Sequence, residues 1–391
     1  MNAPNTPPAA NWNYPTAVKA GAGRIRELPQ HCRALDMHRP LLVTDPGLAA
    51  LPIVTGAVQA CRDDGLDCGL FSAIKGNPTG HNVEDGVAAF HTGRHDGVIA
   101  FGGGSALDAA KAIALMVGQT RPLWDFEDIG DNYLRVNVQG MAPVIAVPTT
   151  AGTGSEVGRA SVITDEAAHI KRIIFHARML PALVILDAEL TTALPARLTA
   201  ATGMDALSHN LEALCSPVYH PMATGIGMEG SRLVHQYLRR AVEDGQDLEA
   251  RHQMLVASSM GATAFQKGLG AMHALAHPLG ARYDAHHGML NAILMPYVLK
   301  ANESVVSDTM TRLARYLDLP RPGFGAVLDW VLALRESIGI PHALAAIGIP
   351  GDAVGTIGAL AVQDASAATN PIPFTPEEYD RILRNAIDGT L

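Results

Sequence analysis

The chain of 391 residues is longer than a single hydrophobic core usually supports, so two domains are expected. Its 48% hydrophobic and 17% charged residues are ordinary for a globular protein and exclude the disordered and fibrous classes. A formal net charge of -9 argues against a nucleic-acid partner, and the apolar runs are too short to span a membrane. Small molecules are therefore the expected partners.

The first residues of the chain, MNAPNTPPAAN, are polar and rich in proline, without the basic start and apolar stretch of a secretory signal. We predict a disordered tail over residues 1–14. The four cysteines show neither C-x-x-C spacing nor the density of a disulfide framework. This usage favours a cytoplasmic protein with reduced thiols.

Short β-branched runs alternate with alanine-rich helical patterns through the first half, which is typical of a mostly parallel sheet covered by helices. Strands are predicted over 39–45, 67–73, 96–102, 142–148 and 182–187, and helical spacing occurs in 83–93 and 106–117. Beyond about Thr191, long helical patterns such as 202–215 and 225–244 dominate. The predicted fold class is an α/β dinucleotide-binding domain over 15–188, followed by an all-α metal-binding domain over 189–391.

A glycine-rich turn, Gly102-Gly103-Gly104-Ser105, follows the strand 96–102 and opens a helix. Glycines allow close approach of the backbone to a ligand, and a helix N-terminus offers free N–H groups to a pyrophosphate. The run departs from G-x-G-x-x-G because Leu107 takes the last position. A plain tight turn is the commoner role of three glycines at a strand end.

A second small-residue segment, VPTTAGTGSE at 147–156, ends the next predicted strand and presents Thr149, Thr150 and Thr153. Parallel sheets bind ligands at this carboxyl edge. Asp45, at the end of LLVTD, can accept a hydrogen bond from a ribose hydroxyl and would repel a 2′-phosphate, which favours NAD over NADP. A cap of the turn TDPG is an equally good role for Asp45.

The segment MHALAHPLGARYDAHHG, residues 272–288, holds four histidines. His273 and His277 are four residues apart and would share a helical face. Pro278 favours an end or kink of that helix at His277, because the residue before a proline is pushed out of the helical region. One ring could then bind a metal while the other faces the substrate.

A cleaner pair, Asp205 and His209, lies at the same spacing in GMDALSHNLE, and His287 offers a further ligand from a turn. One carboxylate and three imidazoles suit Fe(II) or Zn(II) better than Mg²⁺ or Ca²⁺. A single histidine on an apolar helix is more often a core residue than a ligand. The joint occurrence of these types in two short segments favours a metal site, although the H-E-x-x-H pattern is absent.

Four segments together, GGGSALDAAK, PTTAGTGSEV, GMDALSHNLEA and HALAHPLGARYDAHHGMLNAILMPY, resemble the iron-containing (group III) alcohol dehydrogenases. The resemblance implies a cofactor domain, a helical metal domain and a cleft between them. It implies Asp205, His209, His273 and His287 as ligands of Fe(II) or Zn(II). His277 corresponds to a family histidine near the nicotinamide and substrate, and we predict that it relays a proton. His286, where the family often has proline, is left out of the site.

The resemblance also implies an NAD site, with Gly102 to Ser105 at the pyrophosphate and Asp108 and Lys111 in the helix behind it. Asn77, in GNPTGHNV, resembles a segment close to the cofactor, and Lys171, in HIKRIIF, takes the place of a lysine that faces it. The threonines of 147–156 resemble the second cofactor loop. A homo-oligomer, with a dimer as the commonest form, is expected.

The expected reaction is hydride transfer between a metal-bound primary alcohol and NAD, in either direction. Lys267 and Arg159 are candidates to grip a substrate carboxylate, which would favour ω-hydroxy acids, and Phe265 is a candidate wall of the pocket; a surface or packing role is at least as common for each. A metal-free maleylacetate-type reductase and a dehydroquinate-synthase-like lyase that cycles NAD remain alternatives. A non-enzymatic metal-binding protein is a more distant one.

Overall fold

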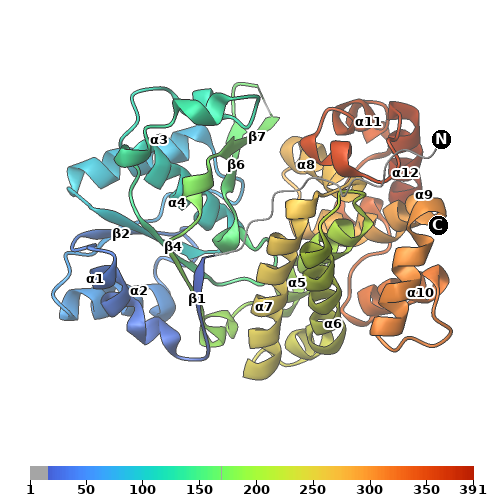
Figure 1. The fold of residues 1–391 in the computed structure, drawn as a ribbon, viewed down its shortest axis with the longest axis horizontal. Coiled ribbons are helices and arrows are strands. Elements are labelled where there is room, and N and C mark those ends of the chain that lie inside the picture. The colour runs from blue at the N-terminus through green and yellow to red at the C-terminus, as the bar shows by residue number, and fades with distance from the viewer. Residues whose placement is uncertain (1–15, 169) are drawn as a thin grey trace, which may run out of the picture.

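The computed structural model describes residues 16–168 and 170–391, so the predicted tail over 1–14 lies outside the described part. The chain divides into a sheet-containing part and a helical part that lie side by side (Figure 1). The N-terminal sheet is parallel throughout, in the order β1-β8-β5-β4-β2-β3. Its strands are β1 (Ala17–Ala20), β2 (Pro40–Val43), β3 (Gly69–Phe71), β4 (Gly97–Gly102), β5 (Val144–Pro148) and β8 (Leu183–Leu186).

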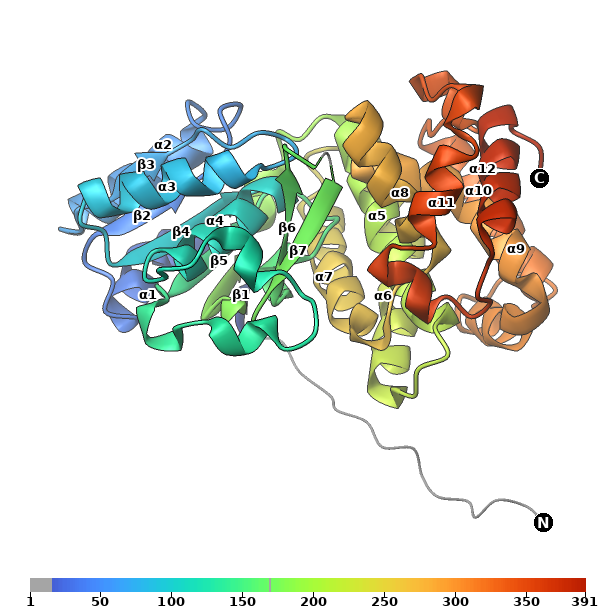
Figure 2. The same ribbon diagram turned by 90° about the horizontal axis from the view of Figure 1, so that it is seen from above.

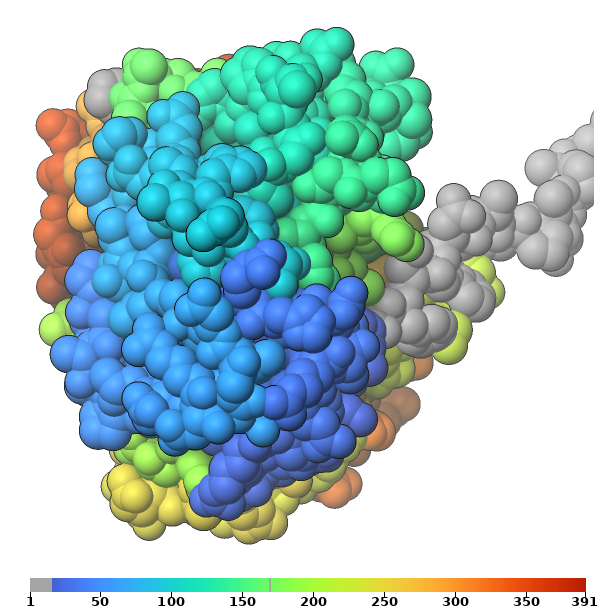
Figure 3. All heavy atoms as spheres, turned by 90° about the vertical axis from the view of Figure 1, so that its left-hand side faces the viewer, coloured from blue at the N-terminus to red at the C-terminus, as the bar shows by residue number. Residues whose placement is uncertain are grey.

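Helices cover both faces of this sheet, which explains why its central strands read as continuous apolar runs. Leu41 and Val43 of β2 pack into one apolar cluster with α3 and α4, whereas Leu42 between them packs into the other with α1 and α2. The bounds are α1 (Leu28–Ala34), α2 (Pro52–Asp63), α3 (Gly80–Thr92) and α4 (Gly104–Met116). The outer side of this part is shown in Figure 3, where the blue and cyan residues of the N-terminal region form the surface.

The C-terminal part is built from helices around a third and larger apolar cluster. Its helices are α5 (Ala196–Cys215), α6 (Pro221–Glu243), α7 (Leu248–Ala264), α8 (Ala271–Tyr283), α9 (His287–Tyr316), α10 (Phe324–Ser337), α11 (Thr356–Ala361) and α12 (Pro376–Asp388). No strand follows β8 in the described residues, as the sequence predicts. No helix in the described ranges is both long enough and apolar enough to cross a bilayer.

Two sets of elements join the parts. An antiparallel hairpin of β6 (Ala160–Asp165) and β7 (Ile170–Phe175) lies between them, with β7 against α8 (Figure 2). The loop after β5 packs against α7 so closely that a Cβ on Gly154, whose φ is +62°, would lie 2.2 Å from the Ala262 Cβ. The second predicted cofactor segment is therefore held directly against the helical part.

Candidate active site

The glycine turn and the threonine segment lie next to each other at the carboxyl edge of the sheet. Gly102 at the end of β4 pairs with Pro148 at the end of β5. Gly102 has φ +144°, a conformation that favours glycine, and a Cβ on Gly104 would lie 2.5 Å from the Thr153 Cγ2. The turn leads into the N-terminus of α4, whose free N–H groups suit a phosphate.

Asp45 caps the turn after β2, and its other carboxylate oxygen faces the glycine turn. Its Oδ1 accepts hydrogen bonds from the N–H groups of Gly47 and Leu48 at 2.9 and 3.1 Å, so the carboxylate caps the turn after β2. Its Oδ2 faces the glycine turn, 3.6 Å from where a Cβ on Gly102 would stand. The turn cap thus fixes a carboxylate beside the predicted cofactor position.

Ser105 and Asp108 of α4 hold neighbouring loops in place. The Ser105 hydroxyl donates to the carbonyl oxygen of Gly76, which is next to Asn77. Asp108 accepts from the Ser155 hydroxyl and from the N–H of Val162 at 2.9 Å. Asp108 therefore organises the loop after β5 and the start of β6 from behind the glycine turn.

Asn77 and Lys171 lie where the cofactor part meets the helical part. Asn77 donates from Nδ2 to Asp284 Oδ1, at the C-terminal end of α8, which bridges the two parts. Burial lowers the pKa of the Lys171 ammonium, while the carboxylates of Asp108, Asp284 and Asp205 oppose this. The Nζ of Lys171 lies 3.5 Å from where a Cβ on Gly280 would stand, so Lys171 on β7 reaches α8, the helix that carries His273.

The four predicted ligands converge at this boundary. Asp205, His209, His273 and His287 each offer a ligand atom, and these atoms lie within 4.8 Å of one another. Asp205 and His209 come from α5, His273 from α8 and His287 from the first turn of α9. One carboxylate and three imidazoles in a largely buried cluster fit a borderline divalent ion.

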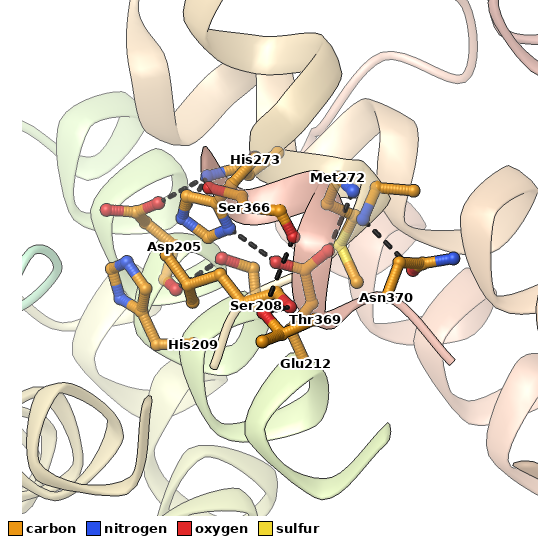
Figure 4. Close-up of polar contacts among 12 residues, drawn as sticks. Asp205, Ser208, His209, Glu212, Met272, His273, Ser366, Thr369 and Asn370 are labelled. Atoms are coloured by element: carbon orange, nitrogen blue, oxygen red, sulfur yellow. Dashed lines mark hydrogen bonds and ion pairs between the residues drawn. The ribbon is translucent and has the colours of Figure 1, made fainter. Parts of the chain in front are cut away.

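Neighbouring acceptors orient two of the three rings, and Figure 4 shows the contact of one of them, His273, with Glu212. The Nδ1 of His273 lies 2.6 Å from Glu212 Oε2, and the Nδ1 of His209 lies 3.2 Å from the Gly152 carbonyl oxygen. An N–H on each Nδ1 leaves Nε2 as the atom with a free lone pair, which is how metal-binding histidines are usually held. The bond to Gly152 also ties a metal-site ring to the loop after β5.

Burial and neighbouring charges set the protonation of the cluster. Burial lowers the pKa of His209 to about 4 and that of His287 well below its usual value, so both rings are neutral at physiological pH. For His273, burial opposes the charged form, but the carboxylates of Glu212, Asp205 and Asp364 together outweigh it and raise the pKa. A metal binds the neutral imidazole, so an ion at this site would replace the proton that a raised pKa favours on His273.

His277 stands beside this cluster. The sequence left open that Pro278 ends the helix at His277. In the structure α8 includes Pro278 and continues to Tyr283. The His277 ring stacks on His287 at 5.5 Å between centroids, and its Nδ1 lies 2.8 Å from Asp364 Oδ2. Burial favours the protonated form of the Asp364 carboxyl, but His277 and the hydrogen bonds from Ser366 together outweigh this and lower its pKa to about 2.

The expectation that Lys267 grips a substrate carboxylate at a pocket mouth is wrong. The residue is 8% exposed, and its Nζ donates to the carbonyl oxygens of Ser216 at 2.6 Å and Leu214 at 3.4 Å. These carbonyls end helix α5, where a cation is favoured by the unpaired acceptors and the helix dipole. Lys267 is therefore a C-terminal cap of α5.

Of the other two substrate candidates, Phe265 borders the histidine cluster and Arg159 does not contact it in the described residues. Arg159 lies over the Phe175 ring at 5.7 Å. Phe175 pairs with Ala160 at one end of the β6–β7 hairpin, whereas Lys171 is at the other end, where Ile170 pairs with Asp165. Nothing in the described contacts brings Arg159 to the histidines. The Phe265 ring is 5.2 Å from the His209 ring, so it does border the cluster. His286, left out of the predicted site, caps α9 by accepting from the Met289 N–H.

Sequence reasoning missed three polar side chains around the cluster, namely Glu212, Asn291 and Asp364. Glu212 is seven residues after Asp205 on α5, so helical spacing could have placed it on the same face. Asn291 is four residues after His287 on α9, a similar signal. Asp364 is 87 residues from His277, and no local pattern connects the two.

Comparisons with known proteins identify the family of the chain. The family model for iron-containing alcohol dehydrogenase matches residues 15–188, and that for the C-terminal part of the Fe-containing alcohol dehydrogenase family matches 199–387. The chain is 38% identical over 385 residues to 4-hydroxybutyrate dehydrogenase of Cupriavidus necator, covering 96% of this chain and 99% of that protein. It is 32% identical to NAD-dependent methanol dehydrogenase of Bacillus methanolicus, covering 96% and 100%.

A solved structure of 1,3-propanediol oxidoreductase superposes with a TM-score of 0.92 at 32% identity, covering 97% of this chain and 100% of that one. The protein is therefore an oxidoreductase, of the class of NAD-dependent alcohol dehydrogenases. Within this class, the chain belongs to the iron-containing alcohol dehydrogenase family. The predicted family and fold class are confirmed.

Proposed function

We propose that the protein interconverts primary alcohols and aldehydes with NAD(H), using a metal ion held by Asp205, His209, His273 and His287. The convergence of these four ligand atoms beside the glycine turn carries the proposal. We take Fe(II) as the metal because of the family, with Zn(II) as the alternative that the same ligands accept. A bound divalent ion would supply Lewis-acid polarisation of the substrate oxygen.

The cofactor half of the proposal uses the carboxyl edge of the sheet. The turn from Gly102 to Ser105 and the N-terminus of α4 would hold the pyrophosphate, with the threonines of the loop after β5 alongside. Oδ2 of Asp45 would accept from a ribose hydroxyl and reject a 2′-phosphate, which makes NAD the cofactor. Asn77 and Lys171 would border the bound cofactor near the histidines.

His277 is proposed to move the proton. With its Nδ1–H held by Asp364, the ring presents Nε2 as the atom that can accept a proton from the reacting alcohol side and return it. Phe265 is proposed as an apolar wall next to His209, which would help to exclude water from the reacting atoms.

We propose a primary alcohol as the substrate. A short ω-hydroxy acid is one candidate, because the similar protein of Cupriavidus necator is a 4-hydroxybutyrate dehydrogenase. Since Lys267 is engaged in capping α5, Lys171 becomes the candidate cation for a substrate carboxylate near the cluster. An assay of NADH formation with simple alcohols, diols and ω-hydroxy acids would rank these classes. Equal rates with and without a substrate carboxylate would contradict a role for Lys171 in substrate choice.

Two other enzyme classes give different outcomes in the same assay. A lyase that cycles NAD internally would release no net NADH with any alcohol. A metal-free reductase would keep full activity after treatment with a chelator and in a His273→Ala variant. The proposed function expects net NADH formation and loss of activity in both metal tests.

We further propose that the protein is cytoplasmic and forms a homodimer. All four cysteines are free thiols, which suits a reducing compartment. In the described residues β1 and β3 each pair on one side only, and a second copy could cover such an edge. Sedimentation of the purified chain as a monomer at micromolar concentration would refute the dimer.

A further inference from the structure

Asn291 contacts three of the four proposed ligand residues, although its residue type is not among the expected ligands. It is fully buried on α9, one turn after His287. Its Nδ2 is 2.9 Å from Asp205 Oδ1, 3.1 Å from His273 Nε2 and 3.2 Å from His287 Nε2. An amide nitrogen therefore faces three of the four proposed ligand residues.

The orientation of this amide follows from the acceptors around it. The reverse orientation would set Oδ1, an acceptor, against a carboxylate oxygen and two ring nitrogens whose lone pairs face the same point. In the present orientation Oδ1 is buried without a hydrogen-bond partner in the described part of the chain. The N–H groups thus make the contacts that matter at this site.

The amide carries two hydrogens, so it can serve at most two of the three acceptors at once. A neutral imidazole Nε2 has one lone pair, which a metal ion would take completely. A carboxylate oxygen has two lone pairs and can bind a metal while it accepts an N–H bond. The bond from Asn291 to Asp205 is therefore the one that is compatible with a bound ion.

Asp205 depends on this bond. The carboxylate is 2% exposed, and Asn291 provides the one hydrogen bond that it accepts from the residues described. By comparison, Glu212 accepts from both His273 Nδ1 and the Met272 N–H. A buried carboxylate with a single donor is directed by that donor.

We propose that Asn291 is a positioning residue, whose Nδ2–H bond to Asp205 Oδ1 directs the carboxylate toward the three imidazoles and so sets the metal affinity. The inference rests on the proposed metal site. The variant Asn291→Leu keeps a similar size and removes the donor, and Asn302→Leu is the matched control. Asn302 is also a buried asparagine of α9, but it bonds to Asn370 and to the Val298 carbonyl instead.

The experiment measures Co(II) and Zn(II) dissociation constants by competition with a chromophoric chelator, together with the visible spectrum of the Co(II) form. We expect Asn291→Leu to bind both ions about 10- to 100-fold more weakly, as for other residues that orient a ligand, with an unchanged Co(II) spectrum at saturation. The Asn302→Leu control should stay within about twofold, because Asn302 touches no ligand.

Wild-type affinity in Asn291→Leu would overturn the inference. A changed Co(II) spectrum at saturation would also overturn it, because the amide would then be a direct ligand. If the leucine variant does not fold, Asn291→Ser asks the same question, since its hydroxyl stops one bond short of the Nδ2 position. Failure of the wild-type protein to bind either ion would instead refute the proposed metal site.

Discussion

Glu212 gives the sharpest test of how the metal site is held, because its carboxylate connects α5 to α8 through two hydrogen bonds. Oε2 lies 2.6 Å from His273 Nδ1, and Oε1 accepts from the Met272 N–H at 2.7 Å. The carboxylate is buried, so neither donor can find water when it is removed. The variant Glu212→Ala therefore leaves a ring N–H and a backbone N–H without acceptors.

The expected loss can be worked out from these two bonds. Leaving one buried donor without a partner costs about 1–3 kcal/mol, so two donors predict a loss of about 2–6 kcal/mol in the free energy of unfolding. Removing the group that orients a ligating histidine lowers metal affinity by about 10- to 100-fold. Glu212→Gln should lose less of both, because its amide oxygen can still accept one of the two N–H groups.

Two measurements check this prediction. Denaturant unfolding of the metal-free protein gives the change in stability, and Zn(II) competition with a chelator gives the affinity. A Glu212→Ala protein with wild-type stability and wild-type Zn(II) affinity would refute the reasoning. A stability loss with unchanged affinity would show that Glu212 supports α8 without orienting His273.

Three other residues lead to separate predictions. Asp45→Ser should raise the ratio of NADP to NAD activity by about tenfold, since one repulsive charge is removed; an unchanged ratio of kcat/KM values would contradict a cofactor role. Lys267→Met should lower the free energy of unfolding by about 1–3 kcal/mol but leave the preference between ω-hydroxy acids and plain alcohols unchanged. A changed preference would indicate that Lys267 contacts the substrate after all. Asp364→Asn should cost about 2 kcal/mol at neutral pH, because the pKa of Asp364 is about 2 in the folded chain against an ordinary aspartate value of 3.8. The lowered pKa of Asp364 stabilises the folded protein above pH 3.8, and this stabilisation is lost as the pH falls to 2. The difference in free energy of unfolding between wild type and variant should therefore shrink across that window. A constant difference would contradict the pairing with His277.

The sequence predicts the central strands because helices bury both of their faces, which makes each one a short apolar run between turns. It does not reveal the β6–β7 hairpin, whose pattern is obscured by polar residues at buried positions. In β6 the alternating buried side chains are Ser161, Ile163 and Asp165, so apolar residues do not mark the inner face. The edge strand β1 is similarly hidden, because most of its side chains are exposed.

The proposed ligands could be found because helical spacing puts Asp205 and His209 on one face and the residue types suit a metal. The polar side chains that contact these residues are less evident from the sequence. The bond between His277 and Asp364 joins positions 87 residues apart, which only the packing of the C-terminal segment against α8 determines. The capping role of Lys267 is likewise hidden, because the sequence does not show that two carbonyls at the end of α5 reach its ammonium.

The most direct test of metal-dependent alcohol oxidation uses protein stripped of metal and then reloaded with Fe(II) or Zn(II). NADH formation from a primary alcohol is followed by absorbance for the stripped, reloaded and His273→Ala proteins, with circular dichroism to confirm folding. The proposed site predicts activity in the reloaded wild type and its near-complete loss in the other two. Full activity of the stripped protein, or of folded His273→Ala without bound metal, would contradict it.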